Sequence, residues 1–173
     1  VLDLSELADL ALHAHDHGSF KVCRKIHLTE GLCAVAAKVP GFEHVREAAE
    51  GFLEGQLDVL FALGALLEQV FALKERGEAT PEGGVIERFR DAMVIDAFFE
   101  NHAYLAGHLF ELASLARGLG YAISPAHCSA MAYIANSLNS LFPEVVGRAA
   151  WLICFLHFGH YRRGLSLLTM LEE

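Results

Sequence analysis

Basic side chains are scarce in this sequence of 173 residues. It has 13 Lys and Arg against 22 Asp and Glu, which gives a formal net charge of -9. Binding to nucleic acid depends on basic side chains that neutralise phosphates, and no long basic cluster is present. We therefore expect no nucleic-acid partner. The same shortage disfavours tight association with an anionic membrane surface.

A long uninterrupted apolar run is also missing, although 54% of the residues are hydrophobic. The longest uncharged stretch, 118–143, is interrupted by Pro125, Asn136 and other polar residues, and the apolar segment 149–158 is too short to span a bilayer. Acidic side chains occupy the first ten residues, where a secretory signal would carry a basic start and an apolar run. The sequence predicts no membrane span and a cytoplasmic location.

Motifs that would name a reaction are absent from the sequence. None of the four cysteines belongs to a Cys-x-x-Cys pair, which argues against a zinc ribbon and a redox dithiol. The sequence has no Gly-x-Ser-x-Gly elbow and no glycine-rich phosphate loop after a strand. The cysteines are best interpreted as buried reduced thiols, namely Cys23, Cys33, Cys128 and Cys154. Whether the protein is an enzyme stays open.

The sequence does show helical periodicity, with prolines and glycines at plausible helix boundaries. Short connections between long helices favour antiparallel neighbours. We therefore predict one all-α domain over 1–173, an up-and-down bundle of five or six helices, two of them long. The expected helices span 3–17, 19–38, 42–76, 85–117, 124–141 and a last segment that Pro143 opens.

Charge is distributed unevenly along the chain. Between 101 and 160 the only Asp, Glu, Lys or Arg residues are Glu111, Arg117, Glu144 and Arg148. Helices this poor in charge lack an ordinary solvated face. We therefore predict a homo-oligomer, a dimer in the simplest case, that uses this half of the chain. By contrast, a series of acidic residues is interpreted as a solvated helix face: Glu47, Glu50, Glu54 and Asp58.

Histidines are numerous, ten in all, and several stand near a glutamate at helical spacing. Each pair three residues apart shares one helix face. Metal centres in helical bundles combine Glu and His in this way, although their motif is Glu-x-x-His and the order here is His-x-x-Glu. The pattern predicts a transition-metal site in the bundle interior, with ligands drawn from His27, Glu30, His108, Glu111, His157 and His160.

Two other interpretations stay open. His44 and Glu47 show the same spacing, so the pattern also arises by chance, and the histidines can be hydrogen-bonded core or interface residues. Alternatively, an apolar pocket with a few polar groups would bind a small apolar molecule, with Asn101, Tyr104 and Trp151 in contact with it. The leading functional hypothesis is a ligand or metal held in the interior. The alternative is a non-enzymatic assembly protein without an interior site.

The stretch 118–164 faintly resembles the later helices of the haem-oxygenase-like TenA family. The resemblance consists of a small loop, a helix with an Ala-Tyr pair at Ala132-Tyr133, and an apolar helix with a cysteine and aromatic residues, 154–161. It covers less than half of the chain and includes no specific motif. What it implies is an all-α protein that binds a ligand or acts as a metal-dependent oxidase.

Overall fold

The chain folds as an all-α bundle, as predicted. The computed structural model describes residues 6, 9–13, 22–76, 92–146 and 164. Every regular element in these ranges is an α-helix: α2 (Val22–Lys38), α3 (Glu43–Leu57), α4 (Val59–Arg76), α6 (Ala92–Gly118) and α7 (Pro125–Val146). Residues 9–13 are also helical.

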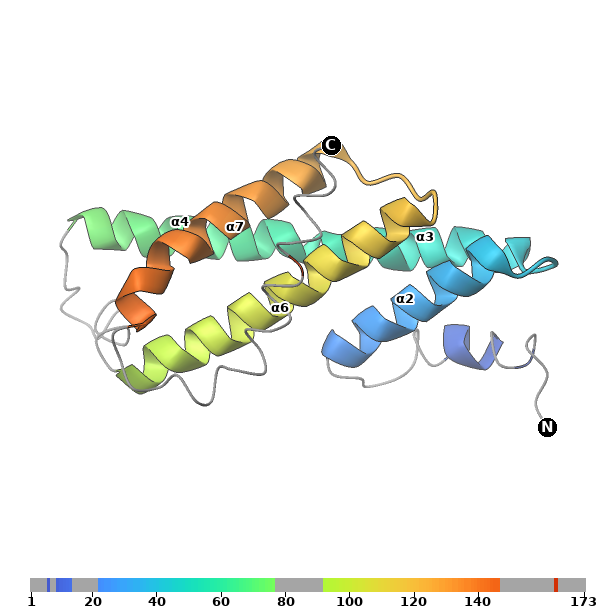
Figure 1. The fold of residues 1–173 in the computed structure, drawn as a ribbon, viewed down its shortest axis with the longest axis horizontal. Helices are drawn as coiled ribbons and strands as arrows, with labels where there is room; N and C mark the ends of the chain where they lie inside the picture. The colour runs from blue at the N-terminus through green and yellow to red at the C-terminus, as the bar shows by residue number, and fades with distance from the viewer. Residues whose placement is uncertain (1–5, 7–8, 14–21, 77–91, 147–163, 165–173) are drawn as a thin grey trace.

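The helices pack in two layers, with α3 and α4 in one and α2, α6 and α7 inclined across them in the other (Figure 1). α3 and α4 follow each other along one long rod, and α2 packs against α3 while α7 packs against α4. α6 contacts α2, α3, α4 and α7 and runs in the same direction as α2 in this view. This arrangement places α2 and α6, the helices with the two predicted His-Glu pairs, side by side.

The turn that ends α6 is fixed by glycine. Gly120 has a φ of +85°, and its N–H donates to the Arg117 carbonyl at 3.0 Å. The Tyr121 N–H then donates to the Ala116 carbonyl at 3.0 Å. These two bonds form a Schellman motif, which requires a left-handed residue and favours glycine there. The chain consequently turns sharply and brings Tyr121 back onto the core.

α7 begins where the sequence predicts the start of a helix. The Ser124 hydroxyl accepts a hydrogen bond from the His127 backbone N–H at 3.1 Å, and Pro125 takes the first helical position. The end of α7 differs from the prediction, because the helix runs through Pro143 to Val146. A proline near the end of a helix removes one backbone hydrogen bond from it. α7 therefore continues through Pro143, where we expected a new helix to begin.

The helix predicted over 42–76 is divided in two at Asp58. The Asp58 N–H donates to the Glu54 carbonyl at 2.9 Å, and the Phe61 N–H donates to the Asp58 carbonyl at 3.1 Å. The second bond spans three residues instead of four, so the helix tightens for one turn before regular α-helical bonding resumes. α3 and α4 stay roughly in line (Figure 1). The division falls at none of the three glycines within 42–76.

The core follows the apolar stripe of each helix. On α3 the buried residues recur every four positions, at Val45, Ala49, Leu53 and Leu57. α6 is buried over most of its second half, which explains why its sequence is poor in charge. Among the described residues, no helix is long and apolar enough to cross a membrane. That the whole of 1–173 forms one domain stays a prediction.

Candidate functional site between α2 and α6

The two predicted His-Glu pairs of α2 and α6 meet at the contact between these helices. On α2, Ile26 and Thr29 are fully buried, so His27 and Glu30 lie at the edge of the buried stripe. On α6, His108 and Glu111 lie in a continuous run of buried residues. The helical spacing of three therefore directs both pairs toward the contact between α2 and α6.

Within each pair the glutamate faces the Nδ1 atom of its histidine. The His27 Nδ1 lies 2.8 Å from Glu30 Oε2, a hydrogen-bond distance. The His108 Nδ1 lies 3.7 Å from Glu111 Oε2, slightly beyond that range. A carboxylate that accepts from Nδ1 fixes the ring tautomer and leaves Nε2 as the nitrogen with a lone pair.

The two pairs differ strongly in exposure. The His27 side chain is 50% exposed, whereas that of His108 is 1% exposed. Glu30 and Glu111 are intermediate between them, at 20% and 10%. The contact between the two pairs thus has a solvent-facing side at His27 and a buried side at His108.

The imidazole of His108 is in contact with two other rings. Its centroid lies 4.9 Å from that of His27, with an interplanar angle of 87°, and 4.4 Å from that of Tyr104, at 88°. These are edge-to-face contacts, which are favourable in themselves. Tyr104 therefore packs against His108.

The remaining predicted site residues are not placed. The side chain of Asn101 lies outside the described part of the structure, as do Trp151, His157 and His160. Gly164 packs against α6 so closely that a Cβ added there would lie 2.7 Å from the Gly107 carbonyl oxygen.

In the described ranges, no group of three or more His, Cys, Asp or Glu side chains is arranged to hold a metal ion. The contact between α2 and α6 supplies two imidazoles. Two imidazoles that bind one ion at about 2.0–2.1 Å in tetrahedral geometry have ring centroids roughly 5 Å apart. The observed 4.9 Å between the centroids of His27 and His108 matches this separation.

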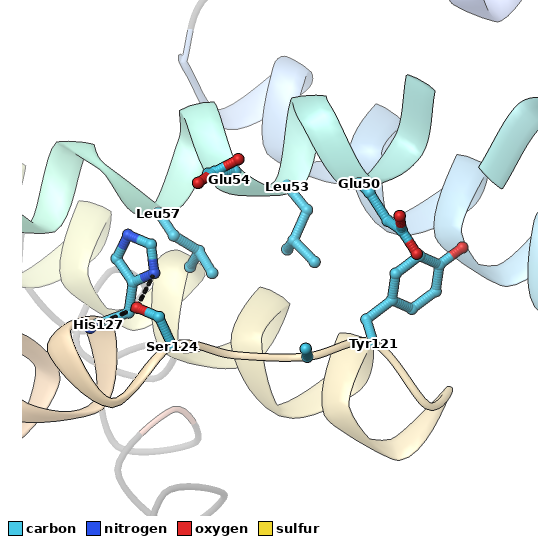
Figure 2. Close-up of a pocket in the computed structure, with 8 residues that line it drawn as sticks. Glu50, Leu53, Glu54, Leu57, Tyr121, Ser124 and His127 are labelled. Atoms are coloured by element: carbon cyan, nitrogen blue, oxygen red, sulfur yellow. Dashed lines mark hydrogen bonds between the residues drawn. The ribbon is translucent and has the colours of Figure 1, made fainter. Parts of the chain in front are cut away.

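A second cluster of polar side chains borders a groove between α3 and the start of α7. The sequence did not predict this cluster. The groove encloses about 270 Å³. Figure 2 shows Leu53 and Leu57 directed from α3 toward Ser124 and Tyr121 on the opposite side. His127 lies at one end of the groove and Glu50, near the Tyr121 ring, at the other.

His127 joins two side chains that are far apart in the sequence. Its Nδ1 lies 2.9 Å from Ser124 Oγ, and its Nε2 lies 3.0 Å from Asp58 Oδ1. Phe61 stacks on the ring, with centroids 4.9 Å apart. Asp58 belongs to the acidic face predicted as solvated, and it is exposed as expected. The spacing Ser-Pro-Ala-His was the available signal, since His127 follows the N-cap serine by three residues.

The far end of the groove is fixed by Tyr121. Its hydroxyl donates to the Cys33 carbonyl at 3.1 Å, and the Arg46 guanidinium lies 4.6 Å above its ring. Burial raises the pKa of Tyr121 to about 12 and the pKa of the Cys33 thiol to about 11. Both groups are therefore neutral at physiological pH, and the tyrosine acts as a hydrogen-bond donor.

Comparison with known proteins identifies no relative. No family model, no curated protein and no solved structure matches the chain.

Proposed function

We propose that the protein binds a transition-metal ion between α2 and α6, through the Nε2 atoms of His27 and His108. The observation behind the proposal is the contact between these two histidines, each oriented by a glutamate three residues later. Imidazole nitrogens suit zinc, copper, iron and nickel, so the ion belongs to this class. Binding of a small apolar molecule beside Tyr104 stays a prediction from the sequence.

The glutamates have an orienting role in this proposal. A metal-binding histidine usually donates its other N–H to a carboxylate, which fixes the ring and increases its basicity. Glu30 already meets this condition at 2.8 Å, and Glu111 meets it after a small rotation from 3.7 Å. The order His-x-x-Glu thus suits a carboxylate outside the ligand shell, whereas Glu-x-x-His motifs supply both ligands directly.

The different exposure of the two histidines sets how the ion enters. His27 lies at the solvent side and turns without disturbing the core, so it captures the ion first. His108 is held by its packing against Tyr104 and forms the fixed, buried side. Two histidines leave coordination positions on the ion for water, for a substrate or for further protein ligands. His157 and His160 remain the predicted candidates for further protein ligands.

The proposal is tested by metal titration of untagged protein treated with a chelator. Co²⁺ is the probe, because its visible absorption reports nitrogen ligation, and calorimetry with Zn²⁺ gives the stoichiometry. We expect one ion per chain. His27→Ala should weaken binding at least about 100-fold, and Glu30→Gln about 10–100-fold, the usual effect of removing an orienting carboxylate.

His44→Ala is the matched control. His44 also precedes a glutamate by three residues on a helix and is also exposed, but its ring stacks on Phe42 instead of a second histidine. This variant should bind Co²⁺ as the unmodified protein does. Equal binding by the His27→Ala variant, or no binding by the folded unmodified protein, would contradict the proposal. A His157→Ala, His160→Ala double variant tests these two residues as further ligands.

The predicted homodimer is part of this proposal and has one supporting observation. The described exposed side chains of α7 between 125 and 140 are all uncharged, and Phe61 and Tyr133 are exposed on the adjacent helices α4 and α7. Light scattering coupled to size exclusion should give a dimer at micromolar concentration. A monomer would remove the prediction. The cytoplasmic location stays a prediction of the sequence.

A further inference from the structure

The groove between α3 and α7 is lined by a serine and a histidine that are hydrogen-bonded to each other, and the histidine is also hydrogen-bonded to an aspartate beyond the lining. We infer that this groove is an esterase site, with Ser124 as nucleophile, His127 as general base and Asp58 as the group that orients His127. This site is separate from the contact between α2 and α6 and does not depend on the metal proposed there. Each of the two can therefore fail alone.

The direction of the hydrogen bonds follows from their partners. An ionised carboxylate only accepts, so the His127 Nε2 carries the proton that it donates to Asp58 Oδ1 at 3.0 Å. In the neutral ring Nδ1 is then an acceptor, and the Ser124 hydroxyl donates to it at 2.9 Å. This is the proton order of an activated serine, with the two ring nitrogens exchanged relative to the usual triad.

The surroundings keep this arrangement in place. His127 is 6% exposed, and Phe61 covers one face of its ring. Ser124 caps α7, a helix of 22 residues, so the positive end of the helix dipole lies beside Oγ. That dipole stabilises the negative charge that develops on the carbonyl oxygen of the ester when the serine Oγ attacks the acyl carbon.

The proposed reaction is ester hydrolysis by acyl transfer. Ser124 Oγ forms a bond to the acyl carbon while its proton passes to His127 Nδ1. The ester C–O bond then breaks, and the leaving alcohol takes that proton. Water next attacks the acyl-enzyme, gives a proton to His127 and releases the acid, and Ser124 regains its proton. No oxidant or reductant is needed.

The lining of the groove indicates a small cationic ester as substrate. Leu53 and Leu57 provide an apolar floor, and Glu50 and Glu54 provide carboxylates along the same helix. Arg46 Nε donates to Glu50 at 3.0 Å and partly neutralises it, so Glu54 is the stronger attraction for a cation. A volume of about 270 Å³ fits a small molecule.

A fluorophosphonate probe tests the nucleophile, with peptide mapping to find the labelled residue. We expect labelling at Ser124. Ser124→Asn should abolish it and still fold, because asparagine is also a good N-cap. His127→Gln should slow labelling about 100-fold or more, the usual contribution of a general base. Asp58→Asn should slow it less, because the Asp58 side chain is 59% exposed and water screens its charge.

The matched control is Ser140→Ala, which removes another α7 hydroxyl, one bonded to the Ser137 carbonyl. It should leave labelling unchanged. The substrate class is tested with acetylthiocholine and its neutral tert-butyl analogue, and Glu54→Gln should reduce the preference for the cation several-fold. No labelling at Ser124, or equal labelling after His127→Gln, would overturn the inference. An equal rate on both esters would overturn the substrate class.

Discussion

Replacing Tyr121 by phenylalanine should destabilise the fold by about 1 kcal/mol, the net value of one buried hydrogen bond. Tyr121 is 3% exposed and its hydroxyl donates to the Cys33 carbonyl, which links the loop after α6 to α2. Phenylalanine keeps the ring, its packing and the contact with the Arg46 guanidinium. The substitution therefore isolates the hydroxyl group.

Urea denaturation followed by circular dichroism measures the change in the free energy of unfolding. In a thermal scan of a chain of this size, a loss of about 1 kcal/mol lowers the melting temperature by roughly 2–4 °C. Tyr121→Ala gives the contrast, since removal of a buried aromatic ring costs about 3–5 kcal/mol. If Tyr121→Phe and Tyr121→Ala were equally stable, the ring would not be packed as described and the reasoning would be refuted.

The pH dependence provides a second check on the same residue. Because burial raises the folded-state pKa of Tyr121 to about 12 from the ordinary 10, the folded protein binds this proton more tightly than the unfolded chain does. The contribution is fully present below about pH 10 and is lost as the pH rises toward 12. The stability difference between the unmodified protein and Tyr121→Phe should shrink over this range. A constant difference would contradict the assignment.

Three further variants or probes test the fold. Gly120→Ala should cost about 1–2 kcal/mol by denaturation, because a φ of +85° is unfavourable for any residue with a Cβ; an unchanged midpoint would argue against the Schellman turn. Leu60→Ala should cost about 2–5 kcal/mol, since Leu60 is fully buried, whereas Leu115→Ala, 41% exposed, should stay within about 0.5 kcal/mol. Cys33, with a pKa of about 11, should react with a thiol reagent more than about 100-fold more slowly than Cys128. Peptide mapping of the labelled protein measures the two rates, and equal rates would contradict the burial of Cys33.

The sequence predicted the helices well because their signals are local. Ser124 and Pro125 mark a helix start through one hydrogen bond and one fixed φ, and Gly118 and Gly120 mark a helix end. The division at Asp58 was not predictable in the same way. Nothing in the local sequence distinguishes Asp58 from the other acidic residues of that face, and its partner His127 lies 69 residues away.

The proposed metal site and the proposed esterase site both combine local and distant information. Spacing alone identified His27 with Glu30 and His108 with Glu111, because each pair lies within one helical turn. The meeting of the two pairs depends on the packing of α2 against α6, which no local pattern encodes. The serine–histidine–aspartate group was missed because its aspartate comes from another helix, and only the capping serine is near His127 in sequence.

His44 shows what decides between a chance pattern and a candidate site. On α3 the buried stripe passes through Val45 and Ala49, and both His44 and Glu47 lie outside it and face solvent. On α2, His27 follows the fully buried Ile26 and lies against the buried face of a second helix. An identical motif thus gives a solvated pair in one helix and a histidine contact in the other. The difference in Co²⁺ binding between His27→Ala and His44→Ala measures what the position of His27 against α6 contributes, since the local motif is the same in both.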